Sequence, residues 1–434
     1  MSNILAIVGR PNVGKSTLFN RLTGMRQAIV DPTSGVTRDR HYGRSDWNGV
    51  EFSIIDTGGY VIGSDDIFES EIRRQVELAL EEADIILFMV DARESLMGMD
   101  QDISELLRRS EKKTFVAANK ADSSEHYHEA SEFYSLGIDQ IFPISAMNGS
   151  GTGELLDAIV KEFKSPVIED IPDIPKIAVI GRPNVGKSSL VNALLGKEQN
   201  IVTPIPGTTR DSVYTRYKGY GFDYFLVDTA GVRKKSRVSE NIEFYSVMRS
   251  IRTIENSDVC LLMVDAEQGF ESQDTNIFSL AQKNHKGIII VVNKWDLIVK
   301  SSNTHKEFEA LIRQKISPFS DVPIVFTSVL NKQRIHKTIE LAHKVYENRR
   351  QKITTSKLNE LLLPVIHNTP PPVTKGKVVK IKYITQLKTP FPAFVFFCNL
   401  PQYVKEPYKR FVENQLRKMF DFSGVPIELY FRDK

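Results

Sequence analysis

The stretch GRPNVGKS, residues Gly9 to Ser16, decides the fold, and it occurs again from Gly181 to Ser188. Both copies fit the pattern G-x-x-x-x-G-K-[ST], and each lies between an apolar run and a stretch with helical character. A glycine-rich loop between a strand and a helix lets backbone N–H groups converge on phosphate, and the helix N-terminus favours an anion. The sequence therefore predicts two P-loop nucleotide-binding domains.

The two loops belong to a duplicated domain. Leu5 to Gly24 matches Ile177 to Gly196 at 13 of 20 positions, at an offset of 172 residues. The same offset relates two downstream motif pairs, VTRD with TTRD and DTGG with DTAG. The motifs NKAD and NKWD are 174 residues apart. A repeat this long indicates tandem domains and excludes a short-period solenoid.

Short apolar runs alternate with amphipathic stretches in both copies. This pattern predicts an α/β fold, with two mostly parallel sheets that have helices on both faces. We expect the first nucleotide-binding domain at residues 1–164, an acidic, proline-containing linker at 165–175 and the second domain at 176–349. Residues 350–434 predict a small α+β domain with a first helix capped by Thr355 or Ser356. Its second helix should bury Phe411, Leu416 and Phe420.

Charge is distributed unevenly along the chain. The net charge is +3, but residues 349–434 hold 16 Lys and Arg against 6 Asp and Glu. A basic domain of this kind suggests a polyanionic partner, and a solvated basic surface is the alternative. No apolar run approaches the roughly 20 residues of a membrane helix. We expect a cytoplasmic protein, without a signal peptide or membrane span, in which Cys260 and Cys398 are buried thiols.

The phosphate loops predict the first set of site residues. Lys15 and Lys187 should reach the β- and γ-phosphates, and Ser16 and Ser188 should place a hydroxyl on Mg²⁺. The remaining nucleotide contacts expected in the two loops are Gly9, Asn12, Gly14, Thr17, Gly181, Asn184, Gly186 and Ser189.

The motifs NKAD and NKWD predict that the base is guanine. A carboxylate at Asp122 and Asp296 can accept both guanine N1–H and the exocyclic amine, whereas adenine N1 would leave it unpaired. A backbone N–H at Ser145-Ala146 should reach guanine O6, and Ser328-Val329 holds the equivalent place, with Val329 where Ala is usual. The other expected base-site residues are Asn119, Lys120, Asn293 and Lys294.

The motifs between these two sets predict a nucleotide-dependent switch. Asp56 and Asp228 should hold Mg²⁺ through its water, and Gly59 and Gly231 should offer a backbone N–H to the γ-phosphate. Thr37 and Thr209 should complete the Mg²⁺ shell only when the γ-phosphate is present. Tyr60 and Val232 replace the Gln that orients water in many GTPases, so we expect slow intrinsic hydrolysis. The predicted catalytic set is Lys15, Thr37, Gly59, Lys187, Thr209 and Gly231.

These residues resemble the TRAFAC-class bacterial GTPases, and their tandem arrangement is similar to the EngA/Der family. The resemblance rests on the doubled GRPNVGKS, the basic GVRKKSRV after DTAG, and the tail NQLRKMFDFSGVPIELYFRDK. It implies a KH-like C-terminal domain, a monomer in the cytosol, and action on the large ribosomal subunit or its precursor. It also implies hydrolysis stimulated by K⁺, with Asn12 and Asn184 as ligands, although Asn also simply favours such a loop turn.

The tail departs from an RNA-clamping KH domain, because its only glycines are Gly376 and Gly424 and no GXXG loop is present. We expect a docking surface for rRNA, a ribosomal protein or the chain's own GTPase domains. Candidate phosphate contacts are Lys375, Lys377, Lys380 and Lys382, for which solubilising edge lysines are the alternative. Two other functions stay open: a tRNA-modification GTPase, for which no segment is left to hold a second catalytic domain, and a nucleotide-gated binding module with little hydrolysis.

Overall fold

The chain forms two compact units, Met1–Asp170 and Ile171–Lys434. The structure is a computed structural model. It describes residues 3–30, 42–57, 72–73, 76–77, 79–81, 83–123, 130–163, 174–196, 214–219, 221–227, 250–251, 253–299, 303–374 and 376–433. No helix in this described part is long and apolar enough to cross a membrane.

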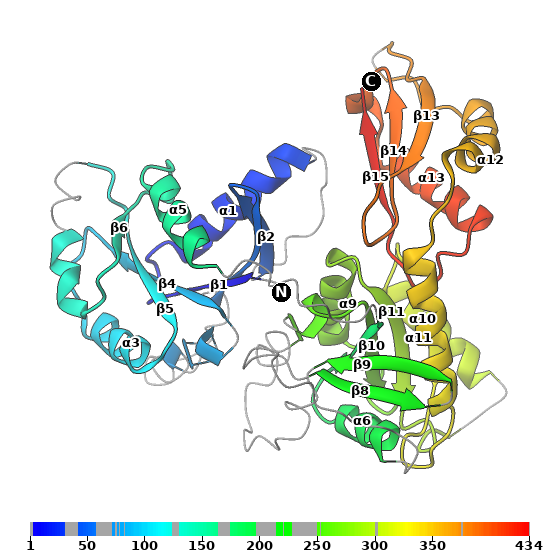
Figure 1. Ribbon diagram of the computed structural model, residues 1–434, viewed down its shortest axis with the longest axis horizontal. Helices are drawn as coiled ribbons and strands as arrows, with labels where there is room; N and C mark the ends of the chain where they lie inside the picture. Colours follow the sequence, from blue (N-terminus) through cyan, green and yellow to red (C-terminus); the bar gives the residue numbers. More distant parts are fainter. Residues whose placement is uncertain are drawn as a thin grey trace. The chain divides into compact units, whose positions relative to one another are not determined.

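The first unit contains a six-stranded sheet in the order β2-β3-β1-β4-β5-β6 (Figure 1). Its strands are β1 (Asn3–Val8), β2 (Tyr42–Trp47), β3 (Val50–Asp56), β4 (Ile85–Asp91), β5 (Lys113–Asn119) and β6 (Ile141–Pro143). All neighbours pair in parallel except β2 and β3, which are antiparallel. Every residue of β4 is buried, as expected for a central strand of a parallel sheet that is covered on both faces.

Helices cover both faces of this sheet. They are α1 (Lys15–Val30), α3 (Gly98–Arg109) and α5 (Thr152–Glu162), together with the 3-10 helix η2 (Ala130–Leu136). α1 and α5 pack their apolar side chains into one core with alternate residues of the strands, among them Leu5 and Ile7 of β1. On α3, Ile103 and Leu107 are buried outside that core, because this helix lies against the other face.

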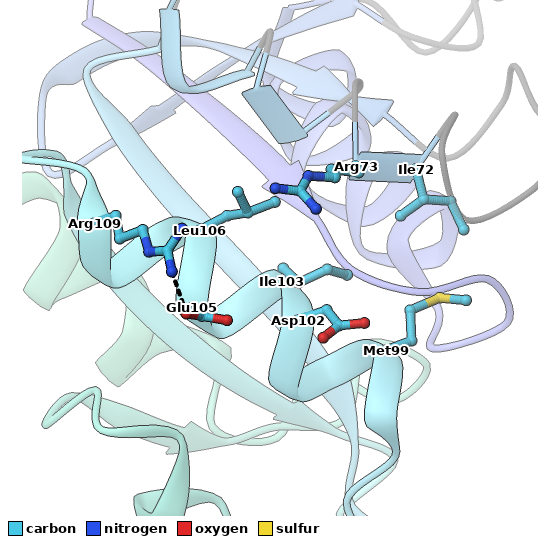
Figure 2. Close-up of a pocket in the computed structure, with 8 residues that line it drawn as sticks. All are labelled: Ile72, Arg73, Met99, Asp102, Ile103, Glu105, Leu106 and Arg109. Atoms are coloured by element: carbon cyan, nitrogen blue, oxygen red, sulfur yellow. Dashed lines mark hydrogen bonds and ion pairs between the residues drawn. The ribbon is translucent and has the colours of Figure 1, made fainter.

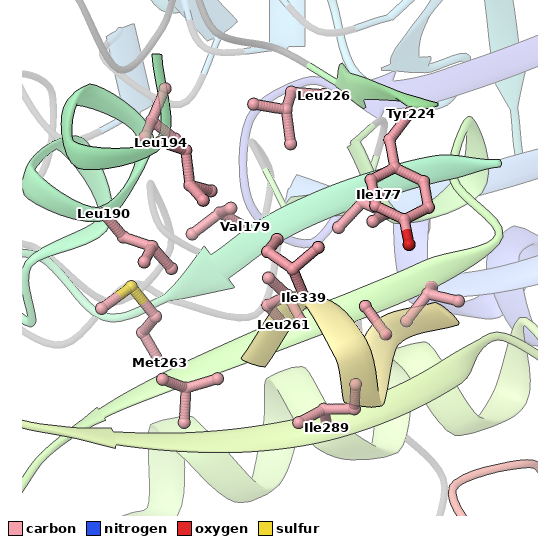
Figure 3. Packing of buried hydrophobic residues seen from close by; sticks show 14 of the residues in the cluster. Ile177, Val179, Leu190, Leu194, Tyr224, Leu226, Leu261, Met263, Ile289 and Ile339 are labelled. Atoms are coloured by element: carbon pink, nitrogen blue, oxygen red, sulfur yellow. The ribbon is translucent and has the colours of Figure 1, made fainter. Parts of the chain in front are cut away.

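The second unit repeats this topology with the strand order β12-β11-β10-β7-β9-β8. Its strands are β7 (Lys176–Gly181), β8 (Tyr214–Gly219), β9 (Phe222–Val227), β10 (Val259–Asp265), β11 (Gly287–Asn293) and β12 (Ile324–Phe326). The helices of this sheet are α6 (Lys187–Leu195), α9 (Ser272–Lys283), α10 (Thr304–Lys315) and α11 (Ile335–Arg350). Figure 3 shows Leu190 and Leu194 of α6 packed onto Val179 and Met263 of the sheet, with Ile339 of α11 in the same core.

A smaller α+β domain follows in the second unit, and it is called the small domain below. It comprises α12 (Thr355–Asn368), β13 (Ile381–Gln386), β14 (Ala393–Cys398), η3 (Pro401–Tyr403), α13 (Glu406–Met419) and β15 (Glu428–Arg432). β14 is central, antiparallel to β13 and parallel to β15. α12 and α13 share one core with the sheet. The predicted α/β class with an added small domain is therefore confirmed.

Two details of the small domain differ from the prediction. The cap of α12 is Thr354, whose hydroxyl accepts the Lys357 N–H at 3.4 Å, so the helix begins one residue earlier than a Thr355 cap requires. α13 buries Tyr408, Val412 and Leu416, while Phe411 is only half-buried. Phe420 is buried as expected, but it lies just past the end of the helix.

The small domain is joined to the preceding sheet by direct hydrogen bonds within the second unit. The Ile288 N–H of β11 donates to Gly424 O at 2.7 Å, and the Gly424 N–H donates to Asp321 O at 2.8 Å. Gly424 has a φ of +77°, and a Cβ there would lie 2.9 Å from Ile288 O. Only glycine fits this close approach without strain.

Candidate guanine-nucleotide sites

Each phosphate loop has a backbone that only glycine can adopt at two positions. A Cβ on Gly9 (φ +146°) would lie 2.3 Å from Met89 O, and one on Gly14 would lie 2.3 Å from Asn119 Nδ2. The second loop repeats these approaches at Gly181 (2.4 Å from Met263 O) and Gly186 (2.3 Å from Asn293 Nδ2). The loop is thus packed against the ends of two strands, with its backbone held in one conformation.

The potassium candidates also have unusual backbone angles. Asn12 has a φ of 64° and Asn184 a φ of 62°, both in the left-handed region. Asn adopts this region more readily than most residues. Backbone conformation alone therefore accounts for asparagine at both positions, and a role in K⁺ binding stays a prediction.

The lysine of each phosphate loop donates to carbonyl groups at the start of the same loop. Lys15 Nζ donates to Gly9 O and Arg10 O, both at 2.7 Å, and Lys187 Nζ donates to Gly181 O at 2.7 Å and Arg182 O at 2.5 Å. Burial lowers the pKa of Lys15 to about 8, against the opposing effect of Asp56. A phosphate beside this amine would stabilise its charged form.

The magnesium candidates of the first loop meet in space. Ser16 Oγ donates to Asp56 Oδ2 at 2.7 Å, and Asp56 is fully buried at the end of β3. Hydroxyl and carboxylate oxygens are ligands that Mg²⁺ prefers, so this pair fits a site for that ion. In the second copy, the residue that corresponds in sequence to Asp56 is Asp228, which lies outside the described residues. So do Thr37, Gly59, Thr209 and Gly231, and their predicted roles stay predictions.

One asparagine in each copy joins the base motif to the phosphate loop. Asn119 Nδ2 donates to Val13 O at 2.7 Å, and its Oδ1 accepts the Ala146 N–H at 2.8 Å. Asn293 forms the same pair with Val185 O at 2.9 Å and the Val329 N–H at 3.0 Å.

The backbone N–H that we expected to face guanine O6 thus has a protein partner in both copies. Its predicted contact with guanine stays a prediction. Because the donor belongs to the backbone, Val329 provides the same hydrogen bond as Ala146 despite its larger side chain.

The motif lysines are oriented by two aspartates that sequence reasoning missed. Lys120 Nζ donates to Asp91 Oδ2, and Lys294 Nζ donates to Asp265 Oδ2 at 2.6 Å. Asp91 and Asp265 end the buried strands β4 and β10. The signal was present in the sequence, since both apolar runs end in the dipeptide VD.

A buried arginine pair was also missed. Arg10 Nε donates to Asp100 Oδ2 at 3.2 Å, and Arg182 Nε lies 3.0 Å from Asp274 Oδ2. Burial raises the pKa of Asp100 and Asp274, while the facing guanidinium opposes the rise. Each arginine thereby anchors the loop carbonyl that accepts the loop lysine. The repeated Arg in GRPNVGKS was its sequence signal.

A cavity of about 300 Å³ lies elsewhere in the first unit. Figure 2 shows that most of its lining comes from α3, which presents Met99, Asp102, Ile103, Glu105, Leu106 and Arg109. Ile72 and Arg73 form the remaining lining. No residue of the phosphate loop or of NKAD lines it, so this cavity is separate from the candidate nucleotide site.

Comparison with known proteins agrees with the duplicated geometry. A family described as 50S ribosome-binding GTPase matches residues 4–120 and 176–294. The KH-domain-like C-terminal domain of EngA bacterial GTPase enzymes matches residues 352–432.

Full-length relatives are similar throughout. The chain is 61% identical to GTPase Der of Christiangramia forsetii over 434 residues, with all of both chains covered. It is 60% identical to GTPase Der of Bacteroides fragilis over 437 residues, again with all of both chains covered. With two GTPase domains and a KH-like tail matched along its whole length, the chain belongs to the EngA/Der family of GTP-binding GTPases.

Proposed function

We propose that the chain is a GTP-hydrolysing switch that acts in biogenesis of the large (50S) ribosomal subunit, in the cytoplasm and as a monomer. The observation that carries the nucleotide part is the doubled geometry of Asn119 and Asn293, each joining a base motif to a phosphate loop. The ribosomal part is supported by the family description and by the basic charge of residues 349–434. The partner would be rRNA or protein of the subunit or its precursor.

Base recognition would rest on Asp122 and Asp296. Lys120 has a φ of 68° and Lys294 a φ of 61°, so the chain turns sharply between each asparagine and its aspartate. A carboxylate placed there can accept two hydrogens from guanine, whereas adenine would leave it unpaired.

Hydrolysis would use the phosphate loop and the Ser16–Asp56 pair. A bound Mg²⁺ would neutralise charge on the β- and γ-phosphates. Lys15 would place its ammonium on the same oxygens, while backbone N–H groups of the loop hold them in line. Since Tyr60 and Val232 replace the usual Gln, we expect a slow intrinsic rate that K⁺, bound near Asn12 and Asn184, increases.

The C-terminal domain would supply the ribosomal contact. Lys377, Lys380 and Lys382 are exposed near the start of β13, and Lys375 lies outside the described residues. Exposed lysines at a sheet edge can bind phosphate or simply prevent edge pairing. Charge reversal at Lys380 and Lys382 distinguishes these two roles. If the lysines bind phosphate, the variant should lose binding to the subunit, whereas lysines that only prevent edge pairing predict unchanged binding.

Sedimentation tests the proposal as a whole. With a non-hydrolysable GTP analogue, the chain should migrate with large-subunit precursor fractions, and the Lys15→Ala, Lys187→Ala double variant should not. Absence of the unaltered chain from those fractions would contradict the ribosomal part. Unchanged GTP turnover in the double variant would contradict the nucleotide part.

A further inference from the structure

The two base sites share a backbone arrangement around the aspartates that orient their lysines. In the first copy, Asp91 Oδ1 accepts the Arg93 N–H at 3.1 Å. In the second copy, Asp265 Oδ1 accepts the Glu267 N–H at 3.0 Å. Arg93 and Glu267 therefore occupy matching places beside NKAD and NKWD, with opposite charges.

From this position, Arg93 contacts the carboxylate of Asp122, the proposed guanine reader of the first copy. Its Nη2 forms an ion pair with Asp122 Oδ2, and its Nε donates to Lys120 O at 3.3 Å. Asn148 Nδ2 lies 3.5 Å from the other carboxylate oxygen, Asp122 Oδ1. Both oxygens of Asp122 thus already face protein donors.

The second copy lacks this arrangement. Glu267 carries a negative charge and cannot donate to Asp296. Within the described residues, no hydrogen bond or ion pair involves the Asp296 carboxylate. The side chain at this matching position is therefore positive in the first copy and negative in the second.

We propose that Arg93 competes with guanine for Asp122, and thereby makes the first site a weaker and less guanine-selective binder than its own residues would otherwise allow. Guanine presents two donors to the carboxylate, N1–H and the exocyclic amine, and full recognition needs both oxygens. Arg93 holds one of them in the ligand-free chain, whereas Glu267 leaves Asp296 to the base. This inference rests on the proposed role of Asp122 in reading guanine.

The size of the effect follows from exposure. The side chains of Arg93 and Asp122 are 51% and 34% exposed, so solvent weakens their attraction. Exposed ion pairs of this kind correspond to about a two- to fivefold change in an equilibrium constant. Salt screens such pairs further, so the effect should shrink as ionic strength rises.

The test compares Arg93→Glu with unaltered Arg93 in the full chain carrying Lys187→Ala, which confines binding to the first site. Titration with a fluorescent GDP should show Arg93→Glu binding about two- to fivefold more tightly at low salt. Inosine diphosphate lacks the exocyclic amine and needs only one carboxylate oxygen, so it should gain less. Arg93→Gln should tighten GDP binding in the same direction.

Two control variants carry a charge reversal of the same size as Arg93→Glu. Arg109→Glu alters the same charge on α3, where Arg109 pairs with Glu105, and should leave GDP affinity unchanged. Glu267→Arg, in a Lys15→Ala chain, should weaken GDP binding at the second site. Unchanged or weaker GDP binding by Arg93→Glu, in a chain that still prefers GDP over ADP, would overturn the inference alone. Equal binding of ADP and GDP before any change at Arg93 would instead overturn the guanine site.

Discussion

Asn119 Nδ2 donates to Val13 O at 2.7 Å, although 106 residues separate them in sequence. This bond joins the end of β5, which precedes the proposed guanine-reading residue Asp122, to the proposed phosphate loop. Because Asn119 Oδ1 also accepts the Ala146 N–H, one buried side chain fixes three segments of the site. The positions of the NKAD motif, the GRPNVGKS loop and Ala146 relative to one another are thereby held by this side chain.

Asn119→Ala should damage folding and binding together. The change leaves a buried carbonyl and a buried N–H without partners, at a cost of about 1–3 kcal/mol each. We expect a lower unfolding free energy for the first unit and weaker GDP binding at the first site, measured by denaturant titration and fluorescence. Asn293→Ala is the matched variant, with its effect confined to the second site. Unaltered GDP affinity in both variants would contradict the joining role.

The sequence alone predicted the parts of the fold that are locally encoded. The GRPNVGKS loops and buried strands have short-range patterns, and the structure places them as expected. Contacts between distant segments were harder to predict, as with Lys120 and Asp91. The repeated dipeptide VD marks Asp91 and Asp265 as candidates, but it does not specify which side chain each of them contacts.

Helix α13 shows a second limit. Tyr408, Val412 and Leu416 lie on one face at four-residue spacing, and Phe411 lies beside it. Periodicity alone could not decide which aromatic ring faces the core, because that depends on the strands it packs against. Docking of Gly424 onto Ile288 likewise depends on the assembled second unit.

Nucleotide binding at the first site should depend on pH through Lys15. The pKa of Lys15 is about 8 in the ligand-free chain, against 10.5 for an ordinary lysine. A neighbouring phosphate favours the charged amine and therefore raises this pKa. Between pH 8 and the higher pKa of the nucleotide-bound state, Lys15 takes up a proton when GDP binds. The GDP affinity should therefore fall as pH rises, by up to about tenfold per pH unit. In the same window the unfolded chain binds more protons, so this group makes the ligand-free fold more stable as pH rises.

Titration of GDP from pH 7 to 9 in the Lys187→Ala chain measures this dependence, below the range in which guanine N1–H itself dissociates. Lys15→Met should lose both the affinity and its pH slope above pH 8. A flat affinity profile in the chain that retains Lys15 would show that the amine is not next to the phosphates.

Removal of the buried carboxylate at Asp100 should destabilise the first unit. Among the residues that the structure describes, Arg10 would keep one charged partner, the half-exposed Glu94. Breaking a buried ion pair from one side costs about 3–5 kcal/mol. We expect Asp100→Ala to lower the unfolding free energy by this order, and Asp102→Ala, at an exposed position of the same helix, to change it little. Similar unfolding curves for the two variants would contradict the anchoring role of Arg10.

Asp296→Asn should shift the second site toward xanthine nucleotides. The amide presents an N–H where the carboxylate presented an oxygen, and xanthine has a carbonyl where guanine has its amine. A competition assay in a Lys15→Ala chain should show XDP displacing labelled nucleotide more readily than GDP does. Retained preference for GDP would place base recognition elsewhere.

Calorimetric titration of the unaltered chain with GTP and with ATP, each with Mg²⁺, tests whether the two domains select guanine. If Asp122 and Asp296 read guanine, GTP should fill two sites per chain and ATP should give no measurable binding at the same concentrations. Uptake of ATP as readily as GTP would contradict the account.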